Sequence, residues 1–221
     1  MSLRICGPSK RPSRGWESDA VPRRDFDPAA LGRKVYPLLN SVVVPRPIAW
    51  VSTRSSDGVD NLAPHSFFTI AGVNPGVVQF TSVGAKDSLR NVLATGEFVV
   101  CICTEELMEK VNLTGTDYPA AVSEFDAVGL TREPSLLVQP FRVAESPVAI
   151  ECRLAGTHEF GECTVVFGEV VHIAVDEEVL VNDRPEITLL RPVARLGADE
   201  WSTIGEVSSR KRVPFSQVTS R

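Results

Sequence analysis

The stretch that decides the fold contains RPIAWVST (46–53), NLAPHSFF (61–68) and KDSLRN (86–91), in that order. An Asp-Gly pair at 57–58 separates the first two segments. It indicates a β-hairpin, and the polar run 55–58 favours a connection longer than two residues. The apolar run 77–80 then predicts a strand that ends in two hydroxyl side chains.

A helix is predicted directly after this strand. We expect Asp87 to be its N-cap, and Gly96 should end it. Lys86 and the free N–H groups of a first helical turn together form a candidate phosphate site. The chain has neither a G-x-x-x-x-G-K-[ST] loop nor a G-x-G-x-x-G turn. An ordinary turn built from the same residues is the alternative.

The order and spacing of these segments resemble the flavin reductase-like family of FMN-binding split barrels. The likeness extends from about Leu39 to Val207, and it includes LRPVARLG (190–197) followed by Trp201. The resemblance implies a mainly β fold, an antiparallel Greek-key split β-barrel with a few peripheral helices. It also implies noncovalent FMN and a homodimer with the flavin near the interface.

The resemblance further implies a set of cofactor-binding residues. The family places the equivalent of 61–67 along the isoalloxazine and ribityl groups, with the phosphate at the strand end and helix start. Arg46 could equally be a surface arginine, and Trp201 could equally pack on the barrel. The residues expected at the FMN site are Arg46, Asn61, Leu62, Ala63, Pro64, Ser66, Phe67, Thr81, Ser82, Lys86, Asp87, Ser88 and Trp201.

The histidines and cysteines give no catalytic or metal assignment. His65 lies inside the proposed flavin segment, but no histidine has metal-ligand spacing with another histidine or a cysteine. Some flavin reductases of this type use a histidine near the ring. Cys163 is the closer match to that position here, and His158 lies five residues earlier. We expect Cys101 and Cys103 to share one face of a strand as core residues.

Composition favours one globular domain. The chain has 221 residues, of which 43% are hydrophobic, and its net charge of -5 gives no support to nucleic-acid binding. No apolar run has the roughly 20 residues that span a bilayer. Five cysteines do not suggest a disulfide framework, so we expect reduced thiols and a cytoplasmic location. The expected divisions are a basic arm (1–24), the flavin reductase-like domain (25–207) and a tail (208–221).

Further elements follow from local patterns. Strands are predicted after Pro47, at 76–82, at 98–103 and at 148–154, where apolar side chains alternate. A long Val-rich strand should cover 163–175, with Gly168 as a bulge or a point of close approach. Helices are expected after Thr104, as an N-cap, and within 123–128.

These features lead to three functional hypotheses. In the first, NAD(P)H reduces bound FMN, which passes electrons to free flavin, oxygen or a partner oxidoreductase. In the second, the protein is an FMN-binding electron carrier or flavin-holding protein without significant NAD(P)H turnover, as the cysteine at position 163 would allow. In the third, the barrel has lost flavin and serves as an interaction scaffold.

Overall fold

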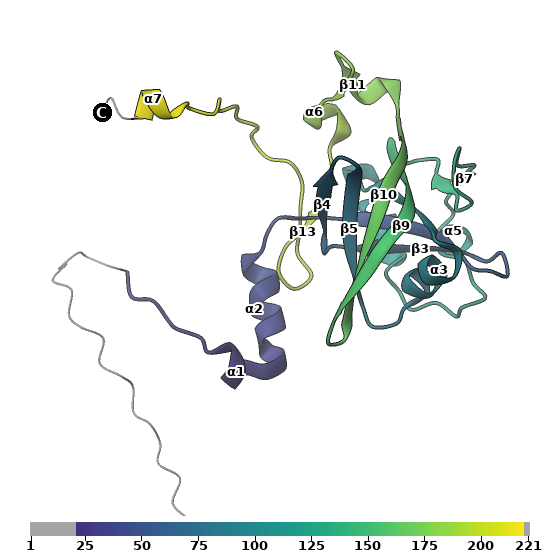
Figure 1. The fold of residues 1–221 in the computed structure, drawn as a ribbon, viewed down its shortest axis with the longest axis horizontal. Helices are drawn as coiled ribbons and strands as arrows, with labels where there is room; N and C mark the ends of the chain where they lie inside the picture. The colour runs from purple at the N-terminus through teal and green to yellow at the C-terminus, as the bar shows by residue number, and fades with distance from the viewer. Residues whose placement is uncertain (1–20, 219–221) are drawn as a thin grey trace, which may run out of the picture. The chain divides into compact units, whose positions relative to one another are not determined.

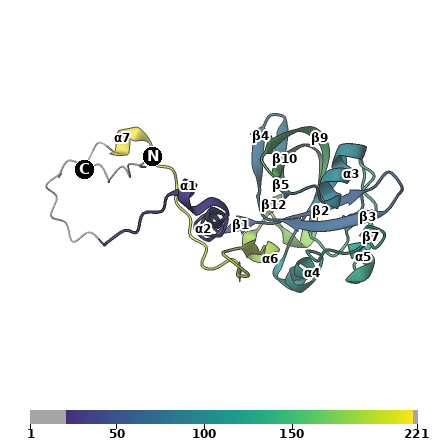
Figure 2. The same ribbon diagram turned by 90° about the horizontal axis from the view of Figure 1, so that it is seen from below.

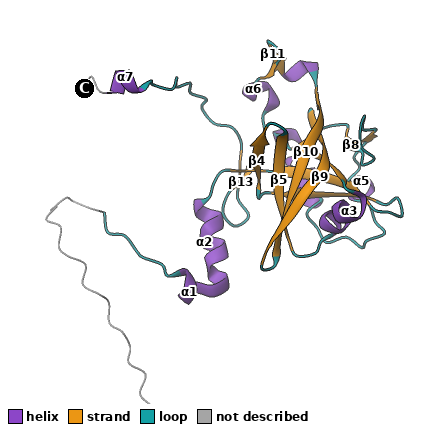
Figure 3. Ribbon diagram, viewed as in Figure 1, coloured by secondary structure: helices purple, strands orange, loops and turns teal. Residues whose placement is uncertain are grey.

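One antiparallel sheet of seven strands dominates the structure, a computed structural model that describes residues 21–218 (Figure 1). Its strand order is β3-β2-β6-β9-β10-β5-β4. Figure 3 shows short helices such as α3 and α5 beside this sheet, and the described chain has the predicted mainly β class with peripheral helices. The strands are β2 (Ala49–Arg54), β3 (Asp60–His65), β4 (Phe68–Val73), β5 (Gly76–Val83), β6 (Glu97–Ile102), β9 (Val148–Phe160) and β10 (Cys163–Val175).

Shorter elements complete the described chain. The small sheets pair β1 (Arg46–Pro47) with β13 (Ala194–Arg195) and β13 with β14 (Trp201–Ser202), β7 (Arg132–Glu133) with β8 (Arg142–Val143), and β11 (Leu180–Val181) with β12 (Arg184–Pro185). The α-helices are α1 (Pro28–Leu31), α2 (Val35–Val42), α3 (Asp87–Thr95), α4 (Met108–Leu113), α5 (Glu124–Ala127), α6 (Ile187–Leu190) and α7 (Phe215–Val218). The 3-10 helices are η1 (Gly32–Lys34), η2 (Glu105–Leu107) and η3 (Glu177–Val179).

Both faces of β2 and β6 are buried over most of their length, which explains the apolar runs 49–51 and 98–101. Side chains alternate between the two faces of a strand, so Trp50 enters one hydrophobic cluster while Val51 enters the other. The Trp50 cluster includes residues of α4 and α5, and the Val51 cluster includes Leu89 and Val92 of α3. Figure 2 shows α3 on one side of β2 and β3 and α4 and α5 on the other.

The long strand predicted at 163–175 is confirmed as β10, and Gly168 has both predicted features. The register to β9 shifts between Phe167 and Gly168, which marks a bulge. A Cβ at Gly168 would clash with the ring of Phe98, so the backbone approaches that ring closely. The strand predicted at 148–154 is confirmed within β9. Glu151 on its second face is fully buried, because Arg142 and two backbone N–H groups bind its carboxylate.

Three helix boundaries match the sequence signals and one does not. Gly96 ends α3 with φ 74°, as predicted. Thr104 is the N-cap of η2, which leads into α4, and the helix predicted within 123–128 is α5. The prediction that Asp87 caps α3 is wrong. Lys86 has the extended N-cap conformation, with φ -79° and ψ 169°, and Asp87 is the first helical residue.

Contacts divide the chain into two units after Val35. The described part of the first unit, residues 21–35, contains α1, which begins where Asp27 accepts from the N–H of Ala29 at 3.0 Å. Residues 1–20 of the predicted basic arm and 219–221 of the predicted tail lie outside the described residues. None of the helices within 21–218 has the length and apolar character needed to span a bilayer.

Candidate functional site

A cavity of about 440 Å³ lies where edge strand β3 meets β5. These strands are far apart in the sheet order, but they contact each other here. The N–H of Thr81 on β5 donates to the carbonyl of Phe67, which directly precedes β4, at 2.9 Å. Nδ1 of His65 also lies 3.4 Å from the carbonyl oxygen of Thr81. The cavity is lined by Tyr36, Asn61, Ala63, Pro64, His65, Ser66, Phe67, Thr81, Val83, Ala85, Lys86, Asp87, Ser88, Arg90, Thr114, Gly115, Thr116, Asp117, Tyr118 and Glu124.

The first turn of α3 gives this cavity a positive end. Lys86 at the N-cap makes no side-chain capping hydrogen bond, so the backbone N–H groups that open the helix have no side-chain cap. The carboxylate of Asp87 pairs with Arg90 instead. Nζ of Lys86 lies 3.5 Å from Asp117, and both side chains are exposed. The turn therefore offers N–H donors, the positive helix end and a cation to an anionic group.

Behind this turn, Ser88 is the centre of a buried polar cluster. Its Oγ accepts a hydrogen bond from Nδ2 of Asn61 at 3.1 Å and lies 3.2 Å from Nε2 of His65. The two residues of β3 and Ser88 are all buried. Burial lowers the pKa of His65 to about 4, because desolvation outweighs the hydrogen bond to Thr81. His65 is therefore neutral at pH 7.

The outer edge of β3 is occupied by Glu124. Its Oε2 accepts from the N–H of Leu62 at 2.8 Å, and burial raises the pKa of its carboxyl group. Successive N–H groups of a strand point to opposite edges, so the N–H of Ala63 faces β2, and Pro64 has none. Backbone donors at 62–64 are thus already used, and this edge offers carbonyl and carboxylate acceptors.

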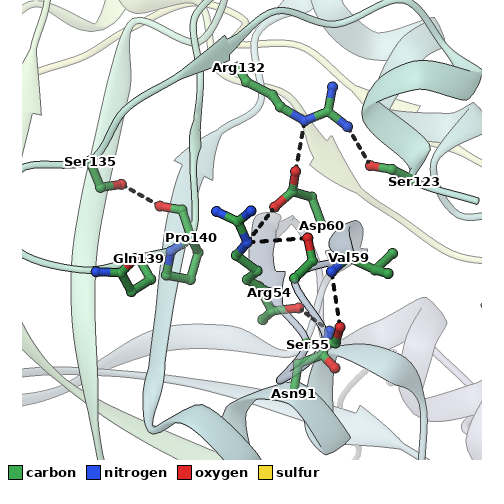
Figure 4. A network of polar contacts seen from close by, with 12 residues as sticks. Arg54, Ser55, Val59, Asp60, Asn91, Ser123, Arg132, Ser135, Gln139 and Pro140 are labelled. Carbon is green, nitrogen blue, oxygen red and sulfur yellow. Dashed lines mark hydrogen bonds and ion pairs between the residues drawn. The ribbon is translucent and has the colours of Figure 1, made fainter. Parts of the chain in front are cut away.

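An ion-pair network holds Glu124 at this position. Asp60, at the start of β3, accepts from Nε of Arg132 at 2.8 Å and lies 3.6 Å from Nε of Arg54 (Figure 4). Arg132 also donates to Oγ of Ser123 at 3.1 Å and binds Asp126 at 2.7 Å. These contacts raise the pKa of Arg132, chiefly through the hydrogen bond to Asp126. They tie α5, and with it Glu124, to β3.

Most of the residues expected at the cofactor site line the cavity. Two of the exceptions are adjacent to lining residues: Leu62 has its side chain in the hydrophobic core, and the hydroxyl of Ser82 donates to the carbonyl of Gly84 at 2.9 Å. The expected residues in the lining are Asn61, Ala63, Pro64, Ser66, Phe67, Thr81, Lys86, Asp87 and Ser88.

The other exceptions, Arg46 and Trp201, lie outside the cavity lining. The guanidinium of Arg46 is buried and donates to the carbonyls of Asn40, Val43 and Leu196. Burial lowers its pKa. The indole of Trp201 lies 4.9 Å beneath the guanidinium of its strand partner Arg195. Both side chains thus hold together the segments of the small β1-β13-β14 sheet and do not line the cavity.

Several lining residues were not predicted. The largest group is the loop 114–118, where a Cβ at Gly115 would lie 3.5 Å from Cγ of Pro64. Tyr36, Val83, Ala85, Arg90 and Glu124 also belong to this unpredicted set. Loop 114–118 and Glu124 reach the cavity through packing between distant segments, for which the sequence pattern carries no signal. His65, which lies inside the proposed flavin segment, also lines the cavity.

His158 and Cys163 lie near the tip of the β9–β10 hairpin. The ring of His158 packs on Phe160 with centroids 4.5 Å apart, and Cys163 is the partner of Val83 on β5. Cys101 and Cys103 are buried in one cluster, as predicted. Within residues 21–218, no group of histidine, cysteine, aspartate and glutamate side chains could hold a metal ion.

Several solved structures resemble this one, including the following three. Nitrilotriacetate monooxygenase component B from Bacillus cereus has a TM-score of 0.82 and 28% identity, over 86% of this chain and 100% of that one. A 2-nitrobenzoate 2-nitroreductase from Pseudomonas fluorescens has a TM-score of 0.80 and 31% identity, over 87% and 97%. A split barrel domain protein from Shewanella frigidimarina, at TM-score 0.74 and 23% identity over 83% and 93%, confirms the split-barrel fold.

Sequence comparison gives the same result. An uncharacterized protein of Aquifex aeolicus is 40% identical over 172 residues, which are 75% of this chain and 88% of that protein. The model of the flavin reductase like domain matches residues 41–190. That range contains β2 to β10 and most of the cavity lining. The chain therefore belongs to the flavin reductase like family.

Proposed function

We propose that this chain binds FMN in the cavity and transfers electrons from NAD(P)H through FMN to free flavin or another acceptor. The observation that carries this proposal is the uncapped first turn of α3, with Lys86, in the cavity wall. Family membership and the named activities of the similar structures support a flavin-dependent redox role.

The donor set of the cavity fits FMN. A volume of about 440 Å³ is within the usual range for small-molecule sites, roughly 300–1,000 Å³. Lys86, Thr81, Ser88 and the first N–H groups of α3 would hold the phosphate. The ribityl chain and the rings would lie along 61–67, where carbonyl acceptors suit hydroxyl and imide donors. The expected residues outside the lining would then support the cavity walls without touching FMN; they are Arg46, Leu62, Ser82 and Trp201.

Bound FMN supplies the hydride and electron chemistry, so the protein residues bind and orient it. Loop 114–118 lines the cavity beside β3, where Gly115 lies against Pro64, and this contact would exclude water from that side. Without ligand, His65 is neutral near pH 7. Glu124 accepts from the N–H of Leu62 and so holds the edge of β3 in place. We assign no general acid or base.

A homodimer is part of the proposal. The family resemblance implies it, and an exposed apolar surface supports it. On β4, Ile70 and Val73 are 74% and 92% exposed, and Leu39 and Val42 of α2 are also exposed. Surface of this kind typically marks an interface. A mass of twice the chain's 24.0 kDa by light scattering is expected. We also propose a cytoplasmic location, where Cys101, Cys103 and Cys152 would stay reduced.

Reconstitution followed by stopped-flow absorption tests the proposed activity. Purified protein saturated with FMN should lose its flavin absorption band when NADH or NADPH is added anaerobically, and excess FMN should then be reduced over many turnovers. If the band is lost with dithionite but with neither nicotinamide, the protein is an electron carrier. If no flavin binds, the scaffold hypothesis is correct and the proposal fails.

A further inference from the structure

The cluster behind the first turn of α3 joins three elements through one hydroxyl group. Ser88 on α3 contacts Asn61 and His65 on β3, and His65 contacts the carbonyl of Thr81 on β5. Ser88 and His65 are 1% and 8% exposed, yet both line the cavity. The mechanism proposed above gives His65 no chemical role, so the reason for a buried imidazole here is open.

Hydrogen-bond donors and acceptors in the cluster can be assigned from chemistry. The Thr81 carbonyl can only accept, so Nδ1 of neutral His65 carries the proton and Nε2 is the acceptor. The hydroxyl proton of Ser88 must then point to Nε2, while the Asn61 amide donates to the same oxygen. Ser88 therefore has no proton left for an anion in the cavity. A phosphate dianion, which only accepts, cannot use the remaining lone pair of Ser88 Oγ.

We propose that His65 is a positioning residue for a phosphate monoester: it takes up a proton when the dianion binds and thereby turns the Ser88 hydroxyl toward the phosphate. The proposal rests on the proposed function, because the phosphate is that of FMN. The proton comes from the buffer and is bound at Nε2 of His65. Nε2 then donates to Ser88 Oγ, whose own proton becomes free to donate to the phosphate. No bond other than hydrogen bonds is made or broken.

The surrounding charges set the conditions for this switch. Lys86 on α3 opposes a charge on His65, as does burial, and the ring of Phe80 on β5 packs against the imidazole at 4.7 Å. The other charged groups lining the cavity are Asp87 and Arg90 on α3, Asp117 in the loop and Glu124 on α5. A bound dianion at the first turn of α3 adds negative charge near His65 and raises its pKa.

The test compares FMN with riboflavin, which lacks the phosphate, in wild-type protein and His65→Gln. The glutamine amide places an acceptor near Ser88 but does not titrate near neutral pH. The preference for FMN is the ratio of the riboflavin and FMN dissociation constants. From pH 8 to pH 6 this ratio should rise roughly threefold or more in wild type relative to His65→Gln. The uptake of one proton allows at most about tenfold per pH unit. Subtracting the pH profile of His65→Gln from that of wild type removes the contributions of the phosphate and of the other charged groups at the cavity.

Calorimetry in two buffers of different ionisation enthalpy gives the direct readout. FMN binding at pH 6 should take up more protons in wild type than in His65→Gln, and riboflavin binding should show no such difference. Equal proton uptake and parallel pH profiles would overturn the proposal. Absence of FMN binding in wild type would instead overturn the proposed function, so the two failures are distinguishable.

A second variant keeps the test decisive if His65→Gln does not fold. Ser88→Ala retains the imidazole but removes the hydroxyl that links it to the cavity. The extra proton uptake should fall to the level of background, and the preference for FMN should lose its additional rise at low pH. Proton uptake that stays at the wild-type value in Ser88→Ala would show that His65 does not act through Ser88.

Discussion

The two ends of strand β3 carry polar clusters of opposite design. At the Asp60 end, one buried carboxylate is matched by Arg132 and Arg54. At the other end, His65 belongs to a buried neutral cluster centred on Ser88, which Asn61 also joins from its place beside Asp60. Lys86 lies at the cavity and is paired with the exposed Asp117. The six residues of β3 thus link two regions: a network of matched charges at one end, and a cavity lined by hydrogen-bond donors at the other.

This difference indicates that the Asp60 end stabilises the fold, whereas the proposed role of the Lys86 end is to bind a ligand. Charges that are matched by buried partners resist removal, because deleting one leaves the other without its counter-ion. Donors that face a cavity cost little folding energy when changed, and their removal weakens a ligand instead. We therefore expect variants at the Asp60 end to change the free energy of unfolding. Variants at Lys86 and Asp117 should change ligand affinity alone.

The largest expected effect is the pH dependence of stability that His65 adds. Its pKa in the folded protein is lowered to about 4, whereas the unfolded value is near 6.5. Between these values the unfolded chain binds more protons, so stability is lost as pH falls from about 6.5 to about 4. The contribution is about 3 kcal/mol. Urea unfolding of FMN-free protein at pH 7 and pH 4 should show it in wild type and not in His65→Gln. Identical pH slopes would contradict the assignment.

Lys86→Ala should weaken FMN by about 1.5–3 kcal/mol, the value of a charge-assisted phosphate contact. Riboflavin affinity should stay within twofold, as should the urea midpoint, because this side chain is exposed. Flavin fluorescence titration measures both ligands. Arg33→Ala, in the first unit, is a control for a change of charge elsewhere. Unchanged FMN affinity would show that the phosphate lies elsewhere.

Asp60→Asn removes the carboxylate charge between two arginines and should lower the free energy of unfolding by about 1–2 kcal/mol. The amide oxygen can still accept from Arg132, which limits the loss. FMN affinity of the folded variant should remain within about threefold of wild type. Denaturant unfolding and a binding titration decide this. A large loss of affinity with unchanged stability would reverse the roles of the two ends.

The smallest expected effect is at Asp117, which competes with the ligand for Lys86. An exposed ion pair contributes about 0–1 kcal/mol, so Asp117→Asn should strengthen FMN binding by no more than about fivefold. Riboflavin should not respond, and Asp57→Asn, in the β2–β3 turn, is the matched control. Titration at low and moderate salt measures the change. Weaker FMN binding in Asp117→Asn would mean that this carboxylate contacts the ligand favourably.

The strands and turns of this fold were predictable because their signals are local. The valine-rich run of β10, the bulge at Gly168 and the end of α3 at Gly96 were all read correctly from neighbouring residues. The cap of α3 was misplaced by one residue, since Lys86 and Asp87 both occur at helix starts. Glu124 and loop 114–118 could not be assigned, because they reach the cavity only after distant segments pack.

The contacts of Ser88 could not be predicted from the sequence either. His65 and Ser88 both lie within the stretch that suggested the family, yet neither spacing nor composition indicates that their side chains meet. The structure shows the N–H of Leu62 bound to Glu124, from a segment 62 residues away. Partners so remote in the chain meet only when α5 packs against β3 and α3 packs against β2 and β3.

The most direct test of the account is a titration of flavin-free protein with FMN and with riboflavin at pH 7. We predict that the protein becomes yellow, binds FMN with 1:1 stoichiometry per chain and prefers it to riboflavin by at least about tenfold, as expected for a charge-assisted phosphate contact. Protein that stays colourless with excess FMN, or that binds both flavins equally, would contradict a phosphate site at the first turn of α3.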